Sequence, residues 1–280
     1  VTGTNYLKLG YYDVSLEEFL LCIKVQPQYK HAYYQAGISY YHLDQNLQAI
    51  GYFNKAINYF PDDKMCYLGR ANSLAKVMKF SEAMSDFSKA ISLDPIDPYI
   101  YYNRGLALSE QSKFEEAIKD FETAIQINPN FVLAYYSKAL SLAEIGKFEE
   151  AIYDFDFIIS KDSKNVDIYI KRGLIYCDLG EYISAYKDFD EAVKLNPQNS
   201  YCYLLRATIH LEVEDYYRAI LDFNQAINFD QDYMEAYYLR GKCFYAYEDY
   251  ENTVEDWKLA AKLGYEEART DLEKTFGIKV

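Results

Sequence analysis

Bases and acids recur in this sequence at a fixed spacing, and the most direct chemistry they could perform is ion pairing. A basic residue returns every 34 positions, and an aspartate follows each base by 16 residues. The basic row is Arg70, Arg104, Lys138, Arg172, Arg206 and Arg240, and the acidic row is Asp86, Asp120, Asp154, Asp188, Asp222 and Asp256. Ala36 and Tyr52 occupy the corresponding positions one period earlier, so both charges are lost together there. This joint loss favours a ladder of structural ion pairs over the alternative, a row of anion-binding sites.

The sequence contains no pattern that we would assign to catalysis. His31, His42 and His210 have no metal-binding partners at suitable spacing, and the motifs HExxH, GxxxxGK and GxSxG are absent. Carboxylates on helices do not form a general acid–base pair without a pocket that perturbs them. We therefore predict no catalytic, cofactor-binding or metal-binding residues, and we expect that the chain is not an enzyme.

The cysteines and the overall charge restrict the class of protein further. The number of cysteines is odd, and no CxxC spacing occurs among them. They fill positions that other repeats give to Ala, Ile, Leu or Ser: Cys22, Cys66, Cys177, Cys202 and Cys243. We expect small buried thiols in a reducing, cytoplasmic environment. The formal net charge of −14 argues against a nucleic-acid partner. No apolar run approaches the length of a membrane span.

Proline positions reveal the organisation that must place these charges. Five of the six prolines lie 34 residues, or a multiple of 34, apart: Pro27, Pro61, Pro95, Pro129 and Pro197. Ser163 and Gln231 occupy the two remaining points of this lattice. The sixth proline, Pro98, follows Asp97, a suitable N-cap, where a helix would begin. A period this regular predicts a stack of similar supersecondary structures instead of one globular core.

One period, residues 98–131, shows what each repeat contains. Apolar and small residues recur at helical spacing in both halves, separated by the polar residues 111–113, and Asn128-Pro129 would end the second helix. The pattern predicts a helical hairpin with one apolar side on each helix. In this frame the full repeats are 30–63, 64–97, 98–131, 132–165, 166–199, 200–233 and 234–267. Below, a residue's place is its number counted within its repeat.

Four places of the repeat have a nearly constant chemical character. The fourth place is always Tyr, the eighth is always Gly or Ala, the twentieth is Ala except for Thr253, and the twenty-fourth is Phe except for Trp257. This arrangement over 34 residues resembles the tetratricopeptide repeat (TPR). Residues 1–29 match part of an eighth repeat, and 268–280 read as a C-terminal capping helix. The resemblance implies an all-α protein, a right-handed α-solenoid superhelix whose first helices line a concave groove.

The second, fifth, ninth and thirteenth places of the first helices form one stripe, which by this resemblance faces the groove. In its middle the stripe would be apolar beside a row of carboxylates, and we predict the partner-binding residues Tyr102, Leu106, Glu110, Tyr136, Leu140, Glu144, Ile170, Leu174, Asp178 and Glu212. The alternative is a solvated acidic face over packing between repeats. If the groove is used, its partner should be apolar with basic residues nearby.

We therefore interpret the chain as a scaffold for protein–protein interaction that holds a protein or peptide in its groove. Two alternatives remain: a non-catalytic arm that recruits substrates for a longer enzyme, and a structural element that self-associates into a homo-oligomer. The chain lacks an initiator Met and begins inside a repeat, so we expect it to be a fragment of a longer protein.

Overall fold

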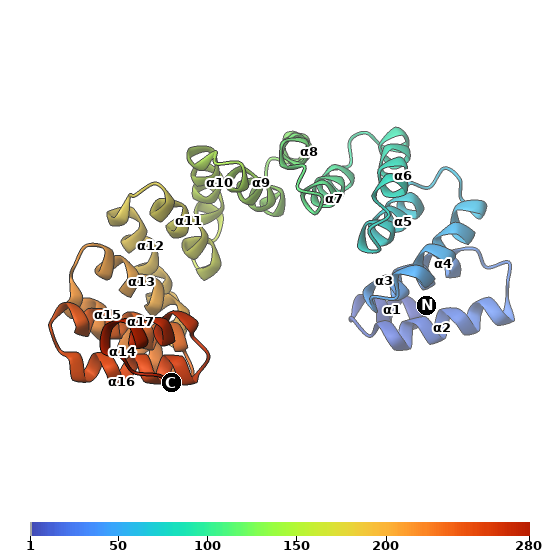
Figure 1. The fold of residues 1–280 in the computed structure, drawn as a ribbon. Helices are drawn as coiled ribbons and strands as arrows, with labels where there is room; N and C mark the ends of the chain where they lie inside the picture. The colour runs from blue at the N-terminus through green and yellow to red at the C-terminus, as the bar shows by residue number, and fades with distance from the viewer. Residues whose placement is uncertain (1) are drawn as a thin grey trace. The chain divides into compact units, whose positions relative to one another are not determined.

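The computed structural model describes residues 2–280, and every regular element among them is a helix. Within residues 2–147 and within residues 148–280, consecutive helices lie side by side (Figure 1). The helices are α1 (Thr2–Lys8), α2 (Tyr12–Val25), α3 (His31–His42), α4 (Asn46–Tyr59), α5 (Lys64–Lys76), α6 (Phe80–Leu93), α7 (Pro98–Ser109), α8 (Phe114–Ile127), α9 (Val132–Glu144), α10 (Phe148–Lys161), α11 (Val166–Asp178), α12 (Tyr182–Leu195), α13 (Ser200–Glu212), α14 (Tyr216–Phe229), α15 (Met234–Ala246), α16 (Tyr250–Lys262) and α17 (Glu266–Phe276). No helix within 2–280 is long and apolar enough to cross a membrane.

The chain divides into two compact units. The N-terminal unit, Val1–Lys147, contains α1 to α9, and the C-terminal unit, Phe148–Val280, contains α10 to α17. Within each unit, a helix packs on its neighbours in sequence, which is the arrangement of an α-solenoid. The division falls inside the predicted repeat 132–165. The limits of the individual repeats and the right-handed superhelix therefore stay predictions.

The turn inside each helix pair depends on one residue with left-handed backbone geometry. This residue always stands at the fifteenth place, with φ between 57° and 81°: Gly10, Asp44, Met78, Ser112, Gly146, Gly180, Glu214 and Glu248. At Met78, for example, the amide of Lys79 donates to the Leu74 carbonyl at 2.9 Å and that of Met78 to Ala75 at 2.8 Å. These two bonds are those of a Schellman cap, which satisfies the last carbonyls of the first helix and turns the chain back.

In five of the repeats, the tyrosine at the fourth place ties the helix pair to the connection that precedes it. Its hydroxyl donates to the carbonyl of the lattice residue six positions earlier, at 3.0–3.3 Å, in the pairs Tyr33–Pro27, Tyr67–Pro61, Tyr101–Pro95, Tyr169–Ser163 and Tyr203–Pro197. Because the acceptor is a main-chain oxygen, the bond survives where Ser163 replaces proline. The phenol group, and not only the ring, explains why this place is Tyr instead of Phe.

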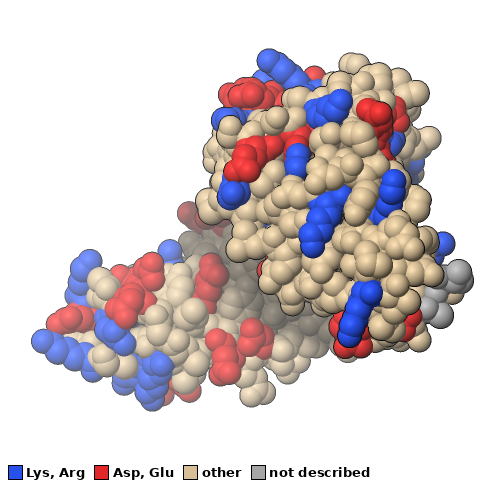
Figure 2. Space-filling view, turned by 90° about the vertical axis from the view of Figure 1, so that its right-hand side faces the viewer, with Lys and Arg blue, Asp and Glu red and all other residues tan. Residues whose placement is uncertain are grey.

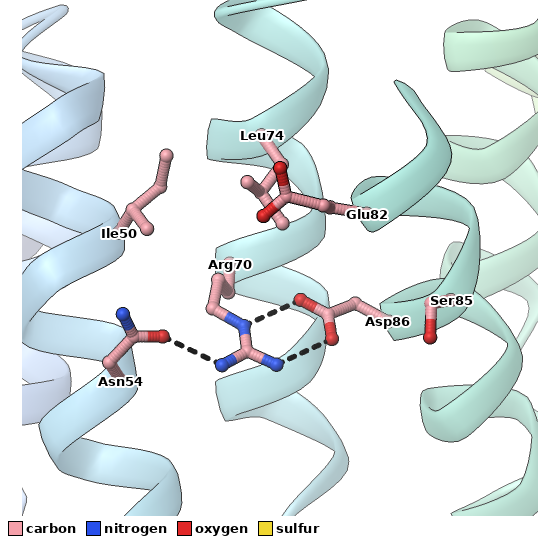
Figure 3. A pocket seen from close by; sticks show the side chains of 7 residues that line it. All are labelled: Ile50, Asn54, Arg70, Leu74, Glu82, Ser85 and Asp86. Atoms are coloured by element: carbon pink, nitrogen blue, oxygen red, sulfur yellow. Dashed lines mark hydrogen bonds and ion pairs between the residues drawn. The ribbon is translucent and has the colours of Figure 1, made fainter. Parts of the chain in front are cut away.

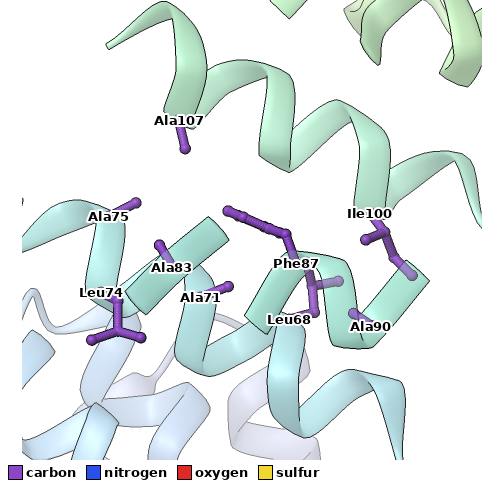
Figure 4. Close-up of a cluster of buried hydrophobic side chains, with 9 residues drawn as sticks. All are labelled: Leu68, Ala71, Leu74, Ala75, Ala83, Phe87, Ala90, Ile100 and Ala107. Atoms are coloured by element: carbon purple, nitrogen blue, oxygen red, sulfur yellow. The ribbon is translucent and has the colours of Figure 1, made fainter. Parts of the chain in front are cut away.

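The core is a series of phenylalanine rings held against very small residues. The six phenylalanines at the twenty-fourth place are completely buried. A methyl group added to Gly105 would lie 2.6 Å from the Phe121 ring, so the two helices of that pair can approach this closely only with a tiny residue there. Figure 4 shows Phe87 of α6 between Ala71 of α5 and Ala107 of α7. One core is thus shared by three successive helices, and no pair can bury its apolar side alone.

The last helix covers the apolar side of the final pair. Ala268 and Leu272 of α17 are completely buried and share a cluster with Trp257 of α16. The Phe276 ring lies 6.0 Å from Trp257, edge to face. The indole N–H of Trp257 donates to the Tyr238 carbonyl of α15 at 3.1 Å. Without α17, the apolar side of α16 would face water.

Candidate partner-binding stripe and charged ladder

In the N-terminal unit, the predicted stripe runs over α7 and α9, which are in contact. Tyr102 and Leu106 of α7 are half-buried. The Tyr102 ring packs 5.0 Å from Phe131 and 6.0 Å from Phe121, so part of its surface serves the packing between repeats. Tyr136 and Leu140 of α9 are half-buried as well. The stripe therefore offers partly exposed apolar surface over a firmly packed layer.

Two predicted carboxylates border this surface, and they differ in their surroundings. Glu144 is exposed at the end of α9. Glu110 follows α7, and its Oε1 lies 3.4 Å from Nζ of Lys76 on α5, with both side chains about half exposed. An ion pair this exposed contributes little to stability, about 0–1 kcal/mol. It does offset part of the negative charge that the sequence assigned to this position.

In the C-terminal unit, the stripe comprises residues of α11 and α13. Leu174 is half-buried, and Asp178 and Glu212 are exposed. Ile170, in contrast, is only 7 % exposed and belongs to the buried cluster around Phe189. Ile170 thus supports the stripe from beneath more than it offers contact area.

The stripe is occupied where it reaches the C-terminus. Tyr238 at the fifth place donates to Oδ2 of Asp271 in α17 at 2.8 Å, and its ring packs 4.9 Å from that of Tyr265. This contact is between two side chains of the chain itself. The open part of the stripe in the C-terminal unit therefore lies on α11 and α13.

The predicted ion-pair ladder is present, and it is bidentate. In each pair, Nε and Nη2 of the arginine donate to the two carboxylate oxygens at 2.6–2.8 Å; the pairs are Arg70–Asp86, Arg104–Asp120, Arg172–Asp188, Arg206–Asp222 and Arg240–Asp256. The hydrogen bonds to Asp86 and Asp120 raise the pKa of Arg70 and Arg104. The sixth predicted pair, Lys138 with Asp154, joins residues of the two units and stays a prediction.

Sequence reasoning missed a third hydrogen bond of this ladder. The remaining nitrogen, Nη1, reaches back to an Asn or Asp at the twenty-fifth place of the preceding repeat, as in Arg70–Asn54 (2.7 Å), Arg172–Asp156, Arg206–Asp190 (2.7 Å) and Arg240–Asn224 (2.5 Å). Each of these arginines therefore joins three helices, as Figure 3 shows for Arg70 between α4, α5 and α6. The signal was available, because the twenty-fifth place carries Asn or Asp ahead of each of these four arginines.

The histidines and cysteines take structural positions. The His42 ring stacks 4.3 Å from Tyr12, and that of His31 stacks 4.8 Å from Phe60. Burial lowers the pKa of His210, while the Asp222 carboxylate acts in the opposite direction. Three cysteines are buried as expected, but Cys22 and Cys177 are only half-buried. Across residues 2–280 no group of three or more His, Cys, Asp or Glu side chains is placed to hold a metal ion.

Charges of both signs are intermixed on the face of the molecule that Figure 2 shows. On the face shown in Figure 2, Lys and Arg side chains alternate with Asp and Glu and with wide uncharged areas. No broad field of one sign dominates that face. Recognition on such a surface has to come from local groups of residues.

The comparisons with known proteins agree with this α-solenoid class. Family models described as tetratricopeptide repeat match residues 31–63, 98–131, 121–153 and 166–199, and a model described as TPR repeat matches residues 79–112. The chain belongs to the tetratricopeptide repeat family. Proteins with this fold are in general non-catalytic scaffolds for protein–protein interaction. No curated protein matches the sequence significantly.

Several solved structures share the fold at low sequence identity. The C-terminal part of a TPR repeat-containing protein from Cytophaga hutchinsonii is 18% identical, with a TM-score of 0.74 over 85% of this chain and 99% of its own. A tetratricopeptide repeat protein from Parabacteroides merdae is 18% identical, with a TM-score of 0.59 over 87% and 96%. YrrB, described as a TPR protein with an unusual peptide-binding site, is 21% identical, with a TM-score of 0.57 over 66% and 95%.

Proposed function

We propose that the chain is a protein-interaction scaffold that binds an apolar, basic segment of a partner along the stripe of α7 and α9 in the N-terminal unit, and a similar segment along the stripe of α11 and α13 in the C-terminal unit. The observation that carries this proposal is the combination of partly exposed Tyr102, Leu106, Tyr136 and Leu140 with the exposed carboxylate of Glu144. Apolar side chains beside unburied carboxylates form a surface that an amphipathic cationic segment complements in both respects. The peptide-binding site named for YrrB supports a peptide as the ligand class.

The two kinds of residue should contribute differently to binding. The carboxylates attract a cationic segment over a distance and speed association, and this attraction weakens with salt. The tyrosine and leucine side chains provide the contact area and set the lifetime of the complex. We propose that Leu174, Asp178 and Glu212 act in the same way in the C-terminal unit, with Ile170 beneath them.

Calorimetry with a Leu/Lys amphipathic peptide and its Leu/Glu counterpart tests the proposal. We expect the Leu/Lys peptide to bind and the Leu/Glu peptide not to bind. Tyr136→Ala should weaken binding about tenfold at both low and high salt. Glu144→Lys should weaken it several-fold at low salt and much less at high salt, and Asp178→Lys should behave likewise.

Glu17→Lys is the matched control, because it makes the same charge change at an exposed position of α2. It should leave affinity within about twofold of the wild type, since long-range charge alone is screened. If Glu17→Lys and Glu144→Lys weaken binding equally, the peptide responds only to net charge and the stripe is not its site. Light scattering over a concentration series distinguishes self-association, which would bury the same surface against a second copy.

A further inference from the structure

One arginine of the ladder lacks the third hydrogen bond that the four others make. Ahead of Arg104, the twenty-fifth place is Ser88 instead of Asn or Asp. The Ser88 hydroxyl donates to the Met84 carbonyl in its own helix at 2.8 Å. Nε and Nη2 of Arg104 are held by Asp120 at 2.7 and 2.6 Å, whereas no side chain within residues 2–280 accepts from Nη1. A guanidinium that is only about a quarter exposed thus keeps its Nη1 group, with two N–H bonds, as a free donor.

This free donor faces a surface cavity that is larger than its counterpart at Arg70. The cavity between α6, α7 and α8 has a volume of about 510 Å³, whereas the one drawn around Arg70 in Figure 3 has about 270 Å³. Apart from Lys113, which lines only the larger cavity, both are lined by residues at the same places of the repeat. In the smaller cavity, Oδ1 of Asn54 accepts from Nη1 of Arg70. The equivalent residue at Arg104 is Ser88, whose side chain is shorter and supplies no such acceptor. We name the larger cavity the Arg104 pocket.

The Arg104 pocket is also the more basic of the two. Lys119 lines it at the place where Ser85 lines the cavity at Arg70, and Lys113 lines it as well. Neither lysine has an ion-pair partner among the described residues. The lysine equivalent to Lys113, Lys79, instead pairs with Glu82 at 3.2 Å. Since Arg104 and Asp120 balance each other, the two lysines exceed the one remaining carboxylate, Glu116, by one positive charge.

The Arg104 pocket is separate from the proposed partner-binding stripe. Arg104 lies two residues from both Tyr102 and Leu106 on α7, and two residues correspond to about 200° around a helix. The pocket and the stripe therefore occupy opposite sides of α7. A ligand of the pocket would not compete with a segment bound along the stripe.

We propose that the Arg104 pocket binds a glutamate side chain of a partner protein. The ionised carboxylate of this glutamate accepts a hydrogen bond from Nη1 of Arg104. The carboxylate takes the position that Asp156 and Asp190 occupy at Arg172 and Arg206. Met84 and Leu108 line the pocket and suit the methylene groups of glutamate. Glu116 on the same wall repels a doubly charged phosphate more strongly than a singly charged carboxylate.

A substitution that supplies an acceptor from within the chain tests whether Nη1 of Arg104 lacks one in solution. Ser88→Asn supplies the amide oxygen that Asn54 supplies at Arg70, and Ser88→Ala is the matched control that supplies none. We expect native-state hydrogen exchange of the α6, α7 and α8 amides to be about fivefold slower in Ser88→Asn than in Ser88→Ala. Equal exchange in the two variants would mean that Nη1 is already satisfied in solution, which overturns the proposal.

Binding is tested with hexaglutamate as the probe, followed by the Nε–Hε signals of the arginines in NMR spectra of the whole chain. We expect a saturable shift of the Arg104 signal with millimolar affinity, no shift of the Arg70 signal, and binding about tenfold weaker in Ser88→Asn. An unshifted Arg104 signal, or equal shifts of Arg70 and Arg104, would overturn the proposal. So would inorganic phosphate shifting Arg104 as strongly at matched ionic strength, because the pocket would then hold a free anion.

Discussion

Replacing the members of one ladder pair, singly and together, measures how strongly the ladder joins the helices. Arg172 and Asp188 are suited to this test because Arg172 has the least exposed side chain among the arginines of the ladder. The side chains are 16% and 5% exposed. Arg172 also donates to Asp156 of α10. We expect Arg172→Ala and Asp188→Ala each to destabilise α11 and α12, with much less than additive loss in the double variant.

The magnitude follows from the burial of each partner. Removing one member of a buried ion pair costs about 3–5 kcal/mol because the other is left uncompensated. Burial raises the pKa of Asp188 even beside Arg172, so the carboxyl group without its partner can take up a proton, which limits the loss. We therefore expect about 3 kcal/mol for Arg172→Ala and about 2 kcal/mol for Asp188→Ala, which leaves Arg172 bound to Asp156. The double variant should lose about 3 kcal/mol, a coupling of about 2 kcal/mol.

Native-state hydrogen exchange of the α11 and α12 amides is the suitable assay, since repeat arrays unfold in parts and a single global midpoint would average over them. Arg218→Ala is the control. Arg218 lies 3.5 Å from Asp215 and is 68% exposed, so its loss should cost less than about 0.5 kcal/mol. Strict additivity of the two single losses would show that Arg172 and Asp188 do not interact in solution, and it would refute this account of the ladder.

Three further outcomes follow from the structure. Deleting 268–280 should expose the side of α16 around Trp257, speed hydrogen exchange in 234–267 and promote aggregation; unchanged exchange would show that this segment is not a cap. Burial raises the pKa of Cys66 to about 12. Its thiol should therefore react with a disulfide reagent near pH 8 far more slowly than that of the half-buried Cys22. Equal rates in single-cysteine variants would contradict this. Burial lowers the pKa of His210 below 6.5, so the unfolded chain takes up the proton first. The stability of the folded chain should therefore fall as the pH drops from about 7 to about 5.5. The His210→Gln variant should lose less stability over that interval, and an identical loss would contradict the assignment.

Much of the fold could be predicted from the sequence because the same physical demand recurs every 34 residues. A tiny residue at the eighth place and a ring at the twenty-fourth determine how closely two helices approach, as Gly105 and Phe121 show. The paired loss of charge at Ala36 and Tyr52 identified the partners of the ladder before any distance was known. Local, repeated contacts of this kind leave a repeated signature in one sequence.

The candidate site was less predictable because it depends on which neighbours cover each side chain. The fifth place is half-buried at Tyr102 but buried at Ile170, although both share the same place in the repeat. Glu110 pairs with Lys76 on another first helix, which a pattern within one repeat does not reveal. The vacancy at Arg104 depends on a hydrogen bond between repeats, which Ser88 does not make because its hydroxyl donates within its own helix. A binding surface depends on the residues in which the repeats differ, and the pattern that the repeats share does not predict it.

The central claim, that an apolar and basic segment binds along the stripe, is tested most directly by locating the bound segment. A photoreactive phenylalanine analogue in place of Tyr136 keeps an aromatic ring on the stripe, and the same analogue in place of Glu17 on α2 serves as the control. With the labelled Leu/Lys peptide, we expect cross-linking from position 136, its loss under an excess of unlabelled peptide, and none above background from position 17. Cross-linking from position 17 alone, or equal yields from both positions, would contradict the account.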